Sequence, residues 1–482
     1  MRKFAFLTLP LACLLQACGG NGRVEPGLTI TDEDRAYGAE AHPQLLAEFG
    51  GDYRGEEARY VAAVGERVAA AAGLGRQCTF TLANSDVVNA FAVPGCYIYV
   101  TRGLVAIVTS EAELASVLGH ELGHIVARHA QRQERRSIWR TLGVIAVSVT
   151  GSERLTKLAS QAAQYFGLRY SRTQEYEADD LGVDYLQRAG YDVYAAADML
   201  SALQRQEAFM IATRSRDAAR GVPEWALSHP LTEHRIDRAH DTAEKTGLKD
   251  DALPEKTAEY LAEVDGLLYG DDPEQGFVIG RRFAHPIMRI SFEAPPGFSL
   301  TNSPQAIRLS GPDDLSGEFG GGAMPDGDLR SYADALAGHV IGDAPAEVTG
   351  ATAATINGLP AIVMQIKVAV RDGAVPLAIA VYDAGDGQAY HFIIASPPTG
   401  GSAAVAALFQ SFRRLSGEEA ASLRPRFVRT VRAAAGDTSE TLIRRIADPA
   451  PRALFELLNA RSGDRPIAPG EVVKIVMYAN RR

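Results

Sequence analysis

The spacing of apolar residues divides this chain of 482 residues into a helical first half and a strand-rich second half. Residues 30–75 carry apolar side chains three and four positions apart, which predicts helices. A strand-like pair follows, in which residues 78–82 lead through a polar turn into the alternating β-branched and aromatic residues 88–100. The two segments could pair as a hairpin.

Ser110 and Glu113 have the spacing of a capping box, which predicts that a helix begins there. An apolar stripe continues along one face of this helix, at Leu114, Val117, Leu118, Ile125 and Val126. A further helix is expected at about 171–188, closed by Gly190, and acidic helical sequence continues to about residue 270.

From Gly276 the pattern changes to short alternating segments and turns, interrupted by helical stretches near 329–340 and 402–414. This predicts a separate, sandwich-like α+β domain at 276–415. After a linker, residues 428–480 have the order strand, two short helices and strand. The chain is therefore expected to be an α+β multidomain protein, with a mainly helical domain at 18–262 that contains a small edge sheet.

Composition and charge are those of a soluble globular protein. The chain is 46% hydrophobic and 22% charged, and its length is enough for two to four domains. The net charge of −10 argues against a nucleic-acid partner, because such partners require a basic face.

The first residues have the pattern of a secretory leader. The apolar run at residues 4–15 follows a basic pair and is too short to anchor in a bilayer. Residues 15–20 resemble the bacterial lipobox, which implies a signal peptide at 1–17 and lipidation of Cys18. Simple cleavage after residue 17 is the alternative. Gly19 after the cysteine implies, by the same resemblance, outer-membrane sorting on the periplasmic side.

Four cysteines are present, and Cys13 would be removed with the leader. If Cys18 is lipidated, Cys78 and Cys96 remain as a pair in an oxidising compartment. Both lie at the ends of the two strand-like segments, so a disulfide is one expectation and two buried free thiols the other.

The candidate chemistry centres on residues 120–124, His-Glu-Leu-Gly-His, within the capped helix. Two imidazoles four residues apart lie on one helical face and can share a metal ion. The glutamate between them, Glu121, would lie beside an open coordination position, where a general base for water is needed. His120, His124 and Glu121 therefore have the HExxH pattern of zinc proteases.

A catalytic zinc requires a third protein ligand, and the acidic helix at 171–188 offers one. Glu175 and Asp179 are four residues apart and share a face, as suits a carboxylate ligand with a second carboxylate that orients an imidazole. Glu177 is the rival ligand, but it lies about 200° round the helix from Glu175, so only one of them can serve.

Four motifs occur in an order that is similar to one family. They are the segment 89–95 (Asn-Ala-Phe-Ala-Val-Pro-Gly), HExxH, Ser171-Arg172 with Glu175 and Asp179, and His229-Pro230 with Arg235. Together they resemble the gluzincin zinc metalloproteases, the family of the heat-shock protease HtpX, the CaaX prenyl protease and the periplasmic β-barrel assembly-enhancing protease. The resemblance covers roughly residues 30–245 and implies a minigluzincin-type fold.

The resemblance implies one Zn²⁺ per chain, held by His120, His124 and Glu175, with Asp179 in support and Glu121 as general base. It places His229 over the metal, either as a fourth ligand in a latent state or as a donor to the oxyanion. A loop histidine without such a role is the alternative.

Arg235 would, by the same resemblance, bind substrate carbonyls or pair with an acidic neighbour. The strand with Asn89, Ala90 and Phe91 would edge the cleft, where extended substrate can add as a further strand. Cys96 replaces a glycine that is common in the family at the edge of the cleft. The resemblance therefore does not determine which substrates this edge prefers.

The last segment resembles the LysM fold, which binds N-acetylglucosamine in peptidoglycan or chitin, through Gly436-Asp437-Thr438, Leu458-Asn459 and Pro469-Gly470. A protein dock built on the same fold is the alternative. The middle domain resembles PsbP-like sandwiches and carries no recognised catalytic constellation.

We therefore expect a periplasmic zinc endopeptidase, anchored to the outer membrane as a lipoprotein, that degrades unfolded or misassembled envelope proteins. The alternative is a mostly latent protease that acts as a chaperone or scaffold in outer-membrane protein assembly. A peptidoglycan-associated hydrolase is a third hypothesis. Expected partners are envelope polypeptides, with peptidoglycan or the assembly machinery as further candidates, and the membrane only through the lipid.

Overall fold

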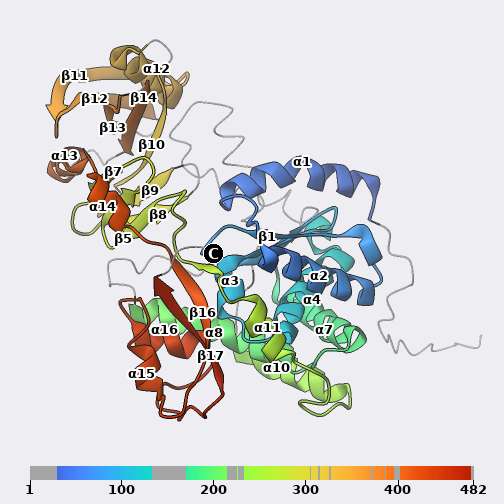
Figure 1. The fold of residues 1–482 in the computed structure, drawn as a ribbon. Coiled ribbons are helices and arrows are strands. Elements are labelled where there is room, and N and C mark those ends of the chain that lie inside the picture. The colour runs from blue at the N-terminus through green and yellow to red at the C-terminus, as the bar shows by residue number, and fades with distance from the viewer. Residues whose placement is uncertain are drawn as a thin grey trace, which may run out of the picture.

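The structure is a computed structural model and describes residues 30–132, 170–213, 225, 229 and 233–478, with short gaps at 304–305, 313–314, 325–326, 371–372, 386 and 396–401. The expected leader and Cys18 lie outside the described residues. The expectation of an α+β multidomain chain is confirmed, with helices in the first half and sheets in the second (Figure 1). Within the described residues, no helix is long and apolar enough to cross a membrane.

Eight helices form the first region in the part of the chain that the structure describes. They are α1 (Asp32–Glu48), α2 (Glu56–Ala71), α3 (Arg102–Ile107), α4 (Glu111–Val126), α7 (Arg172–Ala189), α8 (Ala195–Thr213), α10 (Glu233–Lys245) and α11 (Thr257–Glu263). Helix α4 lies at the centre, in contact with α2, α7 and α8. The element that carries the HExxH motif is therefore the core helix of this region.

A three-stranded sheet with the order β1-β3-β2 flanks the helices. Its strands are β1 (Thr79–Ala83), β2 (Ala90–Val93) and β3 (Tyr97–Thr101). The expected single strand at 88–100 is two strands, because Gly95 and Cys96 both have positive φ and turn the chain back on itself. The expected hairpin between the first and second segments is also wrong, since β1 pairs with β3 in parallel.

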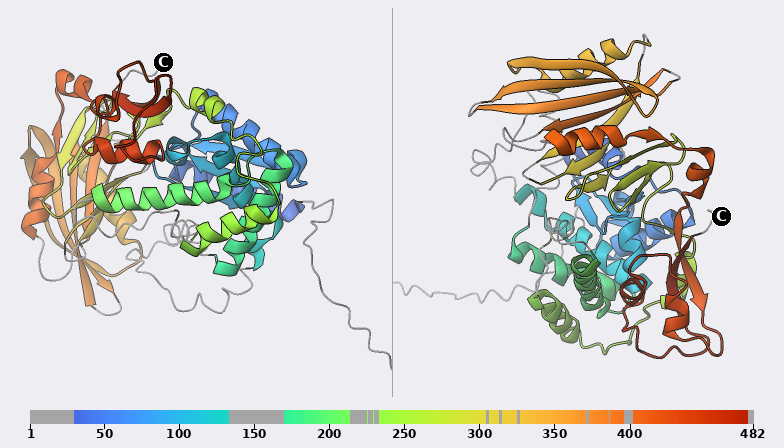
Figure 2. Two further views of the ribbon diagram at one scale, coloured as in Figure 1. Left: turned by 90° about the horizontal axis from the view of Figure 1, so that it is seen from below. Right: turned by 90° about the vertical axis from the view of Figure 1, so that its left-hand side faces the viewer.

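The middle domain consists of two antiparallel sheets and two helices (Figure 2). The larger sheet has the order β11-β12-β13-β14-β10-β9-β8, and the smaller sheet has the order β15-β7-β6-β5. The strands are β5 (Phe277–Ile279), β6 (Arg282–His285), β7 (Ile290–Glu293), β8 (Ser299–Asn302), β9 (Ile307–Ser310), β10 (Ser316–Ala323), β11 (Ala346–Ile356), β12 (Leu359–Val370), β13 (Gly373–Asp383), β14 (Gln388–Ala395) and β15 (Arg413–Arg414). The helices are α12 (Leu329–Ile341) and α13 (Ser402–Ser411).

The centre of the larger sheet, at β13 and β14, is covered on both faces. Successive residues of β13 alternate between two apolar cores, because side chains along a strand point to opposite faces. Ile379 and Val381 join the core under α12, whereas Ala380 and Tyr382 join the core shared with the smaller sheet and α13. The domain thus has apolar cores of its own on both sides of this sheet.

The C-terminal segment has the expected order β16 (Arg426–Arg432), α15 (Ser439–Ile443), α16 (Pro451–Leu458) and β17 (Val472–Tyr478). Residues 415–427, expected to be a linker, contain a short helix, α14 (Gly417–Ser422), which begins with a capping box at Ser416, and the first residues of β16. Strand β16 pairs with β17 and also with β4 (Leu268–Tyr269), which belongs to the chain before the middle domain. The C-terminal module, defined here as residues 426–478, therefore shares a sheet with the helical region.

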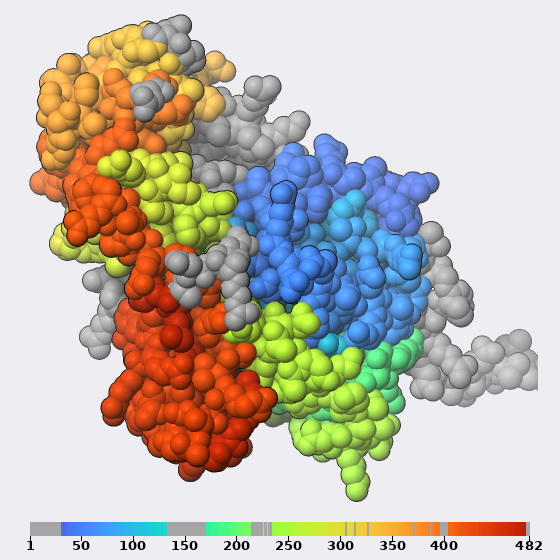
Figure 3. Space-filling model, in the orientation of Figure 1, coloured from blue at the N-terminus to red at the C-terminus, as the bar shows by residue number. Residues whose placement is uncertain are grey.

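The C-terminal module also shares an apolar core with the helical region. Phe455 of α16 and Val476 of β17 belong to the same cluster of buried side chains as Leu118 of α4. In the space-filling view the module lies directly against the residues around 250–270 (Figure 3). Helices α1 to α11 and the C-terminal module are consequently packed as one body.

Lys474 of β17 joins these two parts by polar contacts. Its side chain is fully buried, and its ammonium nitrogen donates hydrogen bonds to the carbonyl oxygens of Ala106, at 2.6 Å, and of Val108. These carbonyls lie at the end of α3, directly before the N-cap Ser110 of α4. The C-terminal module thus holds the segment that leads into the HExxH helix.

Candidate metal centre

Helix α4 presents the HExxH residues to the interior. Ser110 caps its N-terminus, since Oγ accepts a hydrogen bond from the N–H of Glu113. In a capping box the Glu113 carboxylate would accept a hydrogen bond from the N–H of Ser110. Here it accepts from the N–H of Thr109, one residue earlier in the chain. A Cβ at Gly123 would lie 3.0 Å from the Ala178 carbonyl oxygen, so the glycine allows α7 to pack closely against the motif.

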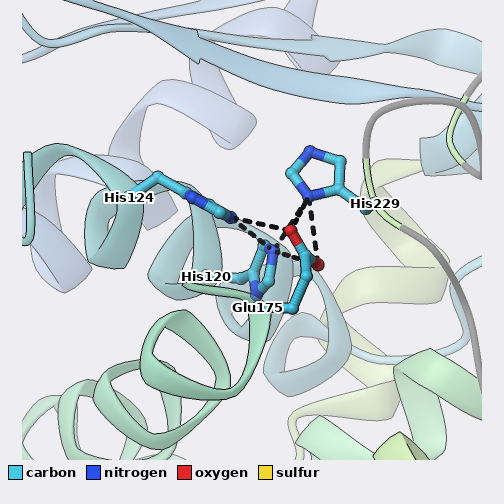
Figure 4. A group of neighbouring side chains, drawn as sticks. All are labelled: His120, His124, Glu175 and His229. Atoms are coloured by element: carbon cyan, nitrogen blue, oxygen red, sulfur yellow. Dashed lines mark hydrogen bonds and ion pairs between the residues drawn. The ribbon is translucent and has the colours of Figure 1, made fainter. Parts of the chain in front are cut away.

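Four side chains from three parts of the chain converge at this point (Figure 4). Nε2 of His120 lies 3.0 Å from Nε2 of His124 and 3.3 Å from Nδ1 of His229. The Glu175 carboxylate lies 3.7 Å from His120 Nε2, 3.6 Å from His124 Nε2 and 3.0 Å from His229 Nδ1. All four residues are buried. The structure thus brings together His120, His124, Glu175 and His229.

Asp179 and Arg235 lie immediately behind this cluster. Asp179 Oδ1 is 2.9 Å from Nδ1 of His120, so the aspartate orients the ring whose other nitrogen faces the cluster. Arg235 is buried and donates from Nε and Nη2 to Asp179, while its Nη1 lies 2.8 Å from Glu175. Of the two roles expected for Arg235, the structure shows pairing with acidic neighbours. Arg235 is a positioning residue because it acts through these two carboxylates.

Glu177, the rival ligand, points away from the cluster. It pairs with His129 at 3.1 Å and with Arg132 at 2.7 Å, and its side chain is 44% exposed. His129 lies five residues past His124, which on a continuous helix would place it about 140° away round the axis, yet its Nδ1 lies 2.8 Å from Nδ1 of His124. The contact forms because α4 ends at Val126 and the chain turns at the positive φ of Arg128.

Glu121 faces the same space from α4. It is 1% exposed, and Oε1 has no hydrogen-bond partner, although Nε2 of His229 lies 3.6 Å away. Burial raises the pKa of this carboxyl, and a hydrogen bond from the backbone of Ala92 opposes the rise. A buried carboxylate oxygen without a partner is costly, and here it is directed to the place where a general base is required.

Aromatic rings line the histidines. Tyr170 stacks on His124 with ring centroids 4.0 Å apart, and Trp225 stacks on His229 at 4.4 Å. Neither ring was expected from the sequence, because a lone aromatic residue outside a motif carries no positional signal. They restrict the imidazoles to one orientation and exclude water from their faces.

The strand with Asn89, Ala90 and Phe91 lies at the edge of its sheet, since β2 is the outer strand beside β3. Strand β2 also contacts α4, and the backbone N–H of Ala92 donates a hydrogen bond to the Glu121 carboxylate. Cys78 and Cys96 form a disulfide that joins the starts of β1 and β3. Of the two expectations for these cysteines, the structure has the disulfide.

The donor set fits a zinc ion. Donors about 2.0–2.1 Å from a tetrahedral zinc lie about 3.3 Å from one another, and the separations of 3.0–3.7 Å bracket that value. Burial lowers the pKa of His124, which favours the neutral imidazole that a metal binds. Burial also lowers the pKa of His229, but Glu175 and Glu121 outweigh it and the net shift is upward.

Comparison with known proteins identifies the region that contains this centre. Residues 56–243 match the model described as "Peptidase family M48". The β-barrel assembly-enhancing protease of Yersinia pestis is 31% identical over 230 residues, which is 45% of each chain, and that of Escherichia coli K12 is 32% identical over 34% of each chain. The mitochondrial metalloendopeptidase OMA1 of Arabidopsis thaliana is 36% identical over 23% of this chain and 22% of its own.

The chain spans less than half the length of these curated relatives. Among solved structures, cyanobacterial PsbP aligns with 29% of this chain and 98% of its own, at 14% identity and a TM-score of 0.22. That score is too low to carry an argument, so the PsbP-like assignment of the middle domain stays a prediction.

Proposed function

We propose that this chain, in which residues 56–243 belong to peptidase family M48, is a zinc-dependent endopeptidase that acts on unfolded or misassembled envelope proteins. The observation that carries the proposal is the buried, unpartnered oxygen of Glu121 beside the cluster of His120, His124 and Glu175. Three donors and an adjacent carboxylate base are the requirements of a metallopeptidase.

Each side chain has a defined task in this proposal. His120, His124 and Glu175 hold the zinc ion, and Asp179 and Arg235 keep His120 and Glu175 in place. Bound there, zinc supplies the Lewis acidity that polarises a peptide carbonyl and makes a water molecule more acidic. Glu121 accepts the proton of the attacking water at Oε1 and delivers it to the leaving amine.

The proposed substrate is an extended polypeptide. Strand β2, with Ala90 and Phe91 and with Asn89 directly before it, is an outer strand of its sheet and contacts α4, so an unfolded segment can add along it as a further strand. Unfolded envelope proteins supply such segments. The names of the Yersinia and Escherichia relatives, β-barrel assembly-enhancing proteases, support the envelope setting. The lipobox-like sequence at Cys18 supports a periplasmic, outer-membrane lipoprotein.

The test is the pair Glu121→Gln and Glu177→Gln. We expect Glu121→Gln to abolish cleavage of casein and of an unfolded outer-membrane protein while the zinc content, measured by elemental analysis, stays at one per chain. Glu177→Gln removes a carboxylate two residues from Glu175 that lies outside the cluster, so activity should remain within about twofold. Full cleavage by zinc-loaded Glu121→Gln would show that the proposal is wrong.

A second candidate is a mostly latent protease that acts as a chaperone or scaffold, and the position of His229 favours it. Its Nδ1 occupies the fourth corner of the donor set, at 3.3 Å from His120 Nε2 and 3.0 Å from Glu175. A catalytic zinc keeps one position open, whereas four protein donors close it. His229 then acts as an internal inhibitor that substrate must displace.

His229→Ala separates the two candidates. If His229 closes the site, the variant should cleave casein faster than the wild type, at unchanged zinc content. If His229 instead donates a hydrogen bond to the oxyanion, kcat should fall by about 10²–10³. In vivo function that survives Glu121→Gln would favour the chaperone or scaffold role.

The proposed glycan-binding role of the C-terminal module rests on its βααβ order and its resemblance to LysM. Peptidoglycan binding is best tested with the intact chain, because the module shares its core with the helical region. We expect the full-length protein to sediment with purified peptidoglycan and soluble chitin oligomers to compete. A protein dock would show no such binding.

A further inference from the structure

A second group of carboxylates lies away from the proposed zinc centre, where the chain turns between α7 and α8. Asp192 in that turn, together with Asp251 and Glu255 of the segment before α11, offers three carboxylate oxygens within 4.8 Å of one another. Asp251 is exposed, Glu255 is half-buried and Asp192 is 1% exposed. Three negative charges therefore meet at one point, one of them inside the protein.

The buried member of this group lacks a partner for one of its oxygens. Asp192 Oδ1 accepts a long hydrogen bond of 3.4 Å from the N–H of Tyr194, whereas Oδ2 has no hydrogen-bond partner. A buried carboxylate oxygen without a hydrogen-bond partner is unfavourable unless a cation compensates it.

The neighbouring cation is engaged elsewhere. Lys256, next to Glu255, has its ammonium nitrogen 2.8 Å from Glu111. Among the described residues, no lysine, arginine or histidine forms an ion pair with the three carboxylates. The described residues therefore leave this group of carboxylates without a compensating positive charge.

We propose that Asp192, Asp251 and Glu255 bind a divalent cation, and that this cation is Ca²⁺. The donors are all oxygens and include no nitrogen or sulfur, which disfavours zinc. Two oxygens on one Ca²⁺ lie at most about 5 Å apart, twice the Ca–O distance, so oxygens within 4.8 Å of one another can share the ion. Ca²⁺ accepts an irregular set of carboxylates, whereas Mg²⁺ demands near-ideal octahedral geometry.

The position of this site gives it a structural role. The N–H of Asp192 donates to the carbonyl of Pro254, and the carbonyl of Glu255 accepts from the N–H of Ala112 in the first turn of α4. A cation held between Asp192 and Glu255 would therefore fix the segment before α11 against both the α7–α8 turn and the HExxH helix. This inference is independent of the proposed peptidase activity.

The test is calcium-dependent stability of the full-length, zinc-loaded protein in buffer freed of divalent ions without a chelator. We expect CaCl₂ to raise the Tm by a few degrees, with half-saturation at about 0.1–1 mM, as for extracellular calcium modules. MgCl₂ at equal concentration should give a smaller shift. Isothermal titration should show one calcium ion per chain.

Asp192→Asn should abolish the calcium-dependent shift, and Asp251→Asn, whose side chain is exposed, should weaken calcium binding about tenfold with little risk to folding. Glu259→Gln, an exposed carboxylate in the neighbouring helix α11, is the matched control and should respond like the wild type. A wild type that shows no shift up to 10 mM CaCl₂ would overturn the proposal. So would an undiminished response in both Asp192→Asn and Asp251→Asn.

Discussion

The middle domain and the C-terminal module both follow the helical region in the chain, yet they relate to it in opposite ways. The middle domain encloses its own cores, in which Phe392 and Ile379 are fully buried. The C-terminal module places Phe455 in the core of the helical region and adds β16 to β4. The segment adjacent in sequence is thus the more independent one, and the distant segment completes the helical region (α1 to α11, hereafter the peptidase body, since residues 56–243 match peptidase family M48).

The pairing of β4 with β16 explains this arrangement. Leu268 lies opposite Phe427, and Tyr269 lies opposite Arg426, in antiparallel register. The chain therefore leaves the peptidase body at β4, forms the whole middle domain and returns beside the point of departure. An apolar pattern shows that a segment is buried, but the partner against which it is buried follows from such long-range pairing.

The largest expected effect comes from removing each part in turn. Deletion of residues 426–482 exposes the face of the shared core that the module covers with Leu442, Leu454, Phe455, Leu458 and Val476. At roughly 2 kcal/mol for each such side chain, the loss approaches the whole stability of a domain, about 5–15 kcal/mol. We expect the truncated protein to lose its cooperative thermal transition and its stoichiometric zinc.

The converse deletion should leave the peptidase body folded. Replacing residues 271–424 by a short glycine-rich turn joins two strands that are already neighbours. We expect zinc content and casein cleavage to persist, measured as in the truncation. Equal damage by both deletions would contradict the distinction between the two parts.

A matched pair of core substitutions tests the same distinction at single residues. Phe455→Ala and Phe392→Ala each remove a fully buried ring, at a cost of about 3–5 kcal/mol. Phe455→Ala should lower the unfolding midpoint of the peptidase body and reduce zinc retention. Phe392→Ala should destabilise only the middle domain, seen as an earlier separate transition in calorimetry, with cleavage unchanged.

A smaller effect is expected at the polar contact between the module and the peptidase body. Lys474→Met preserves the length of the side chain but removes the donors to Ala106 and Val108. Leaving these buried carbonyls without partners should cost about 1–3 kcal/mol, measured by urea unfolding. Arg432→Met, on the exposed end of β16, is the control and should change the stability by less than about 0.5 kcal/mol.

The smallest expected signal is the pH dependence of that contact. Burial lowers the pKa of Lys474 from 10.5 to about 7, against the opposing charge of Glu113. Between these values the unfolded chain binds more protons than the folded one, so this group makes the protein more stable as the pH rises. The wild type should gain at most about 1 kcal/mol per pH unit relative to Lys474→Met between pH 8 and 9.5. Parallel stability profiles would contradict the lowered pKa.

The sequence predicted the chemistry of the centre better than its surroundings. His120, Glu121 and His124 follow from helical spacing, which is a local property. The choice of Glu175 over Glu177, and the place of His229 over the metal, came from the family resemblance. The structure brings His120, His124, Glu175 and His229 together. The contact between His129 and His124 was not expected, because the end of α4 depends on a left-handed Arg128 that no glycine signals.

The fold shows the same division. Helix starts and the alternation within strands were visible in the sequence, since capping and pleating involve residues close together in the chain. The parallel pairing of β1 with β3 was not visible in the sequence, because it depends on how α2 and α4 pack on the sheet. Lys474 would be expected on a solvated strand face, and only the approach of α3 and α4 buries it.

The sequence by itself determined which residue types are available for metal binding. Its apolar pattern also determined that the helix carrying the HExxH motif is buried. Tertiary structure decided that His229 meets His120, His124 and Glu175, that Arg235 pairs with Glu175 and Asp179, and that Asp192 meets Asp251 and Glu255. The physical reason is the distance along the chain over which each interaction acts. Hydrogen bonds within a helix fix residues a few positions apart, whereas the pairing of distant segments depends on burying apolar surface that many partners could cover.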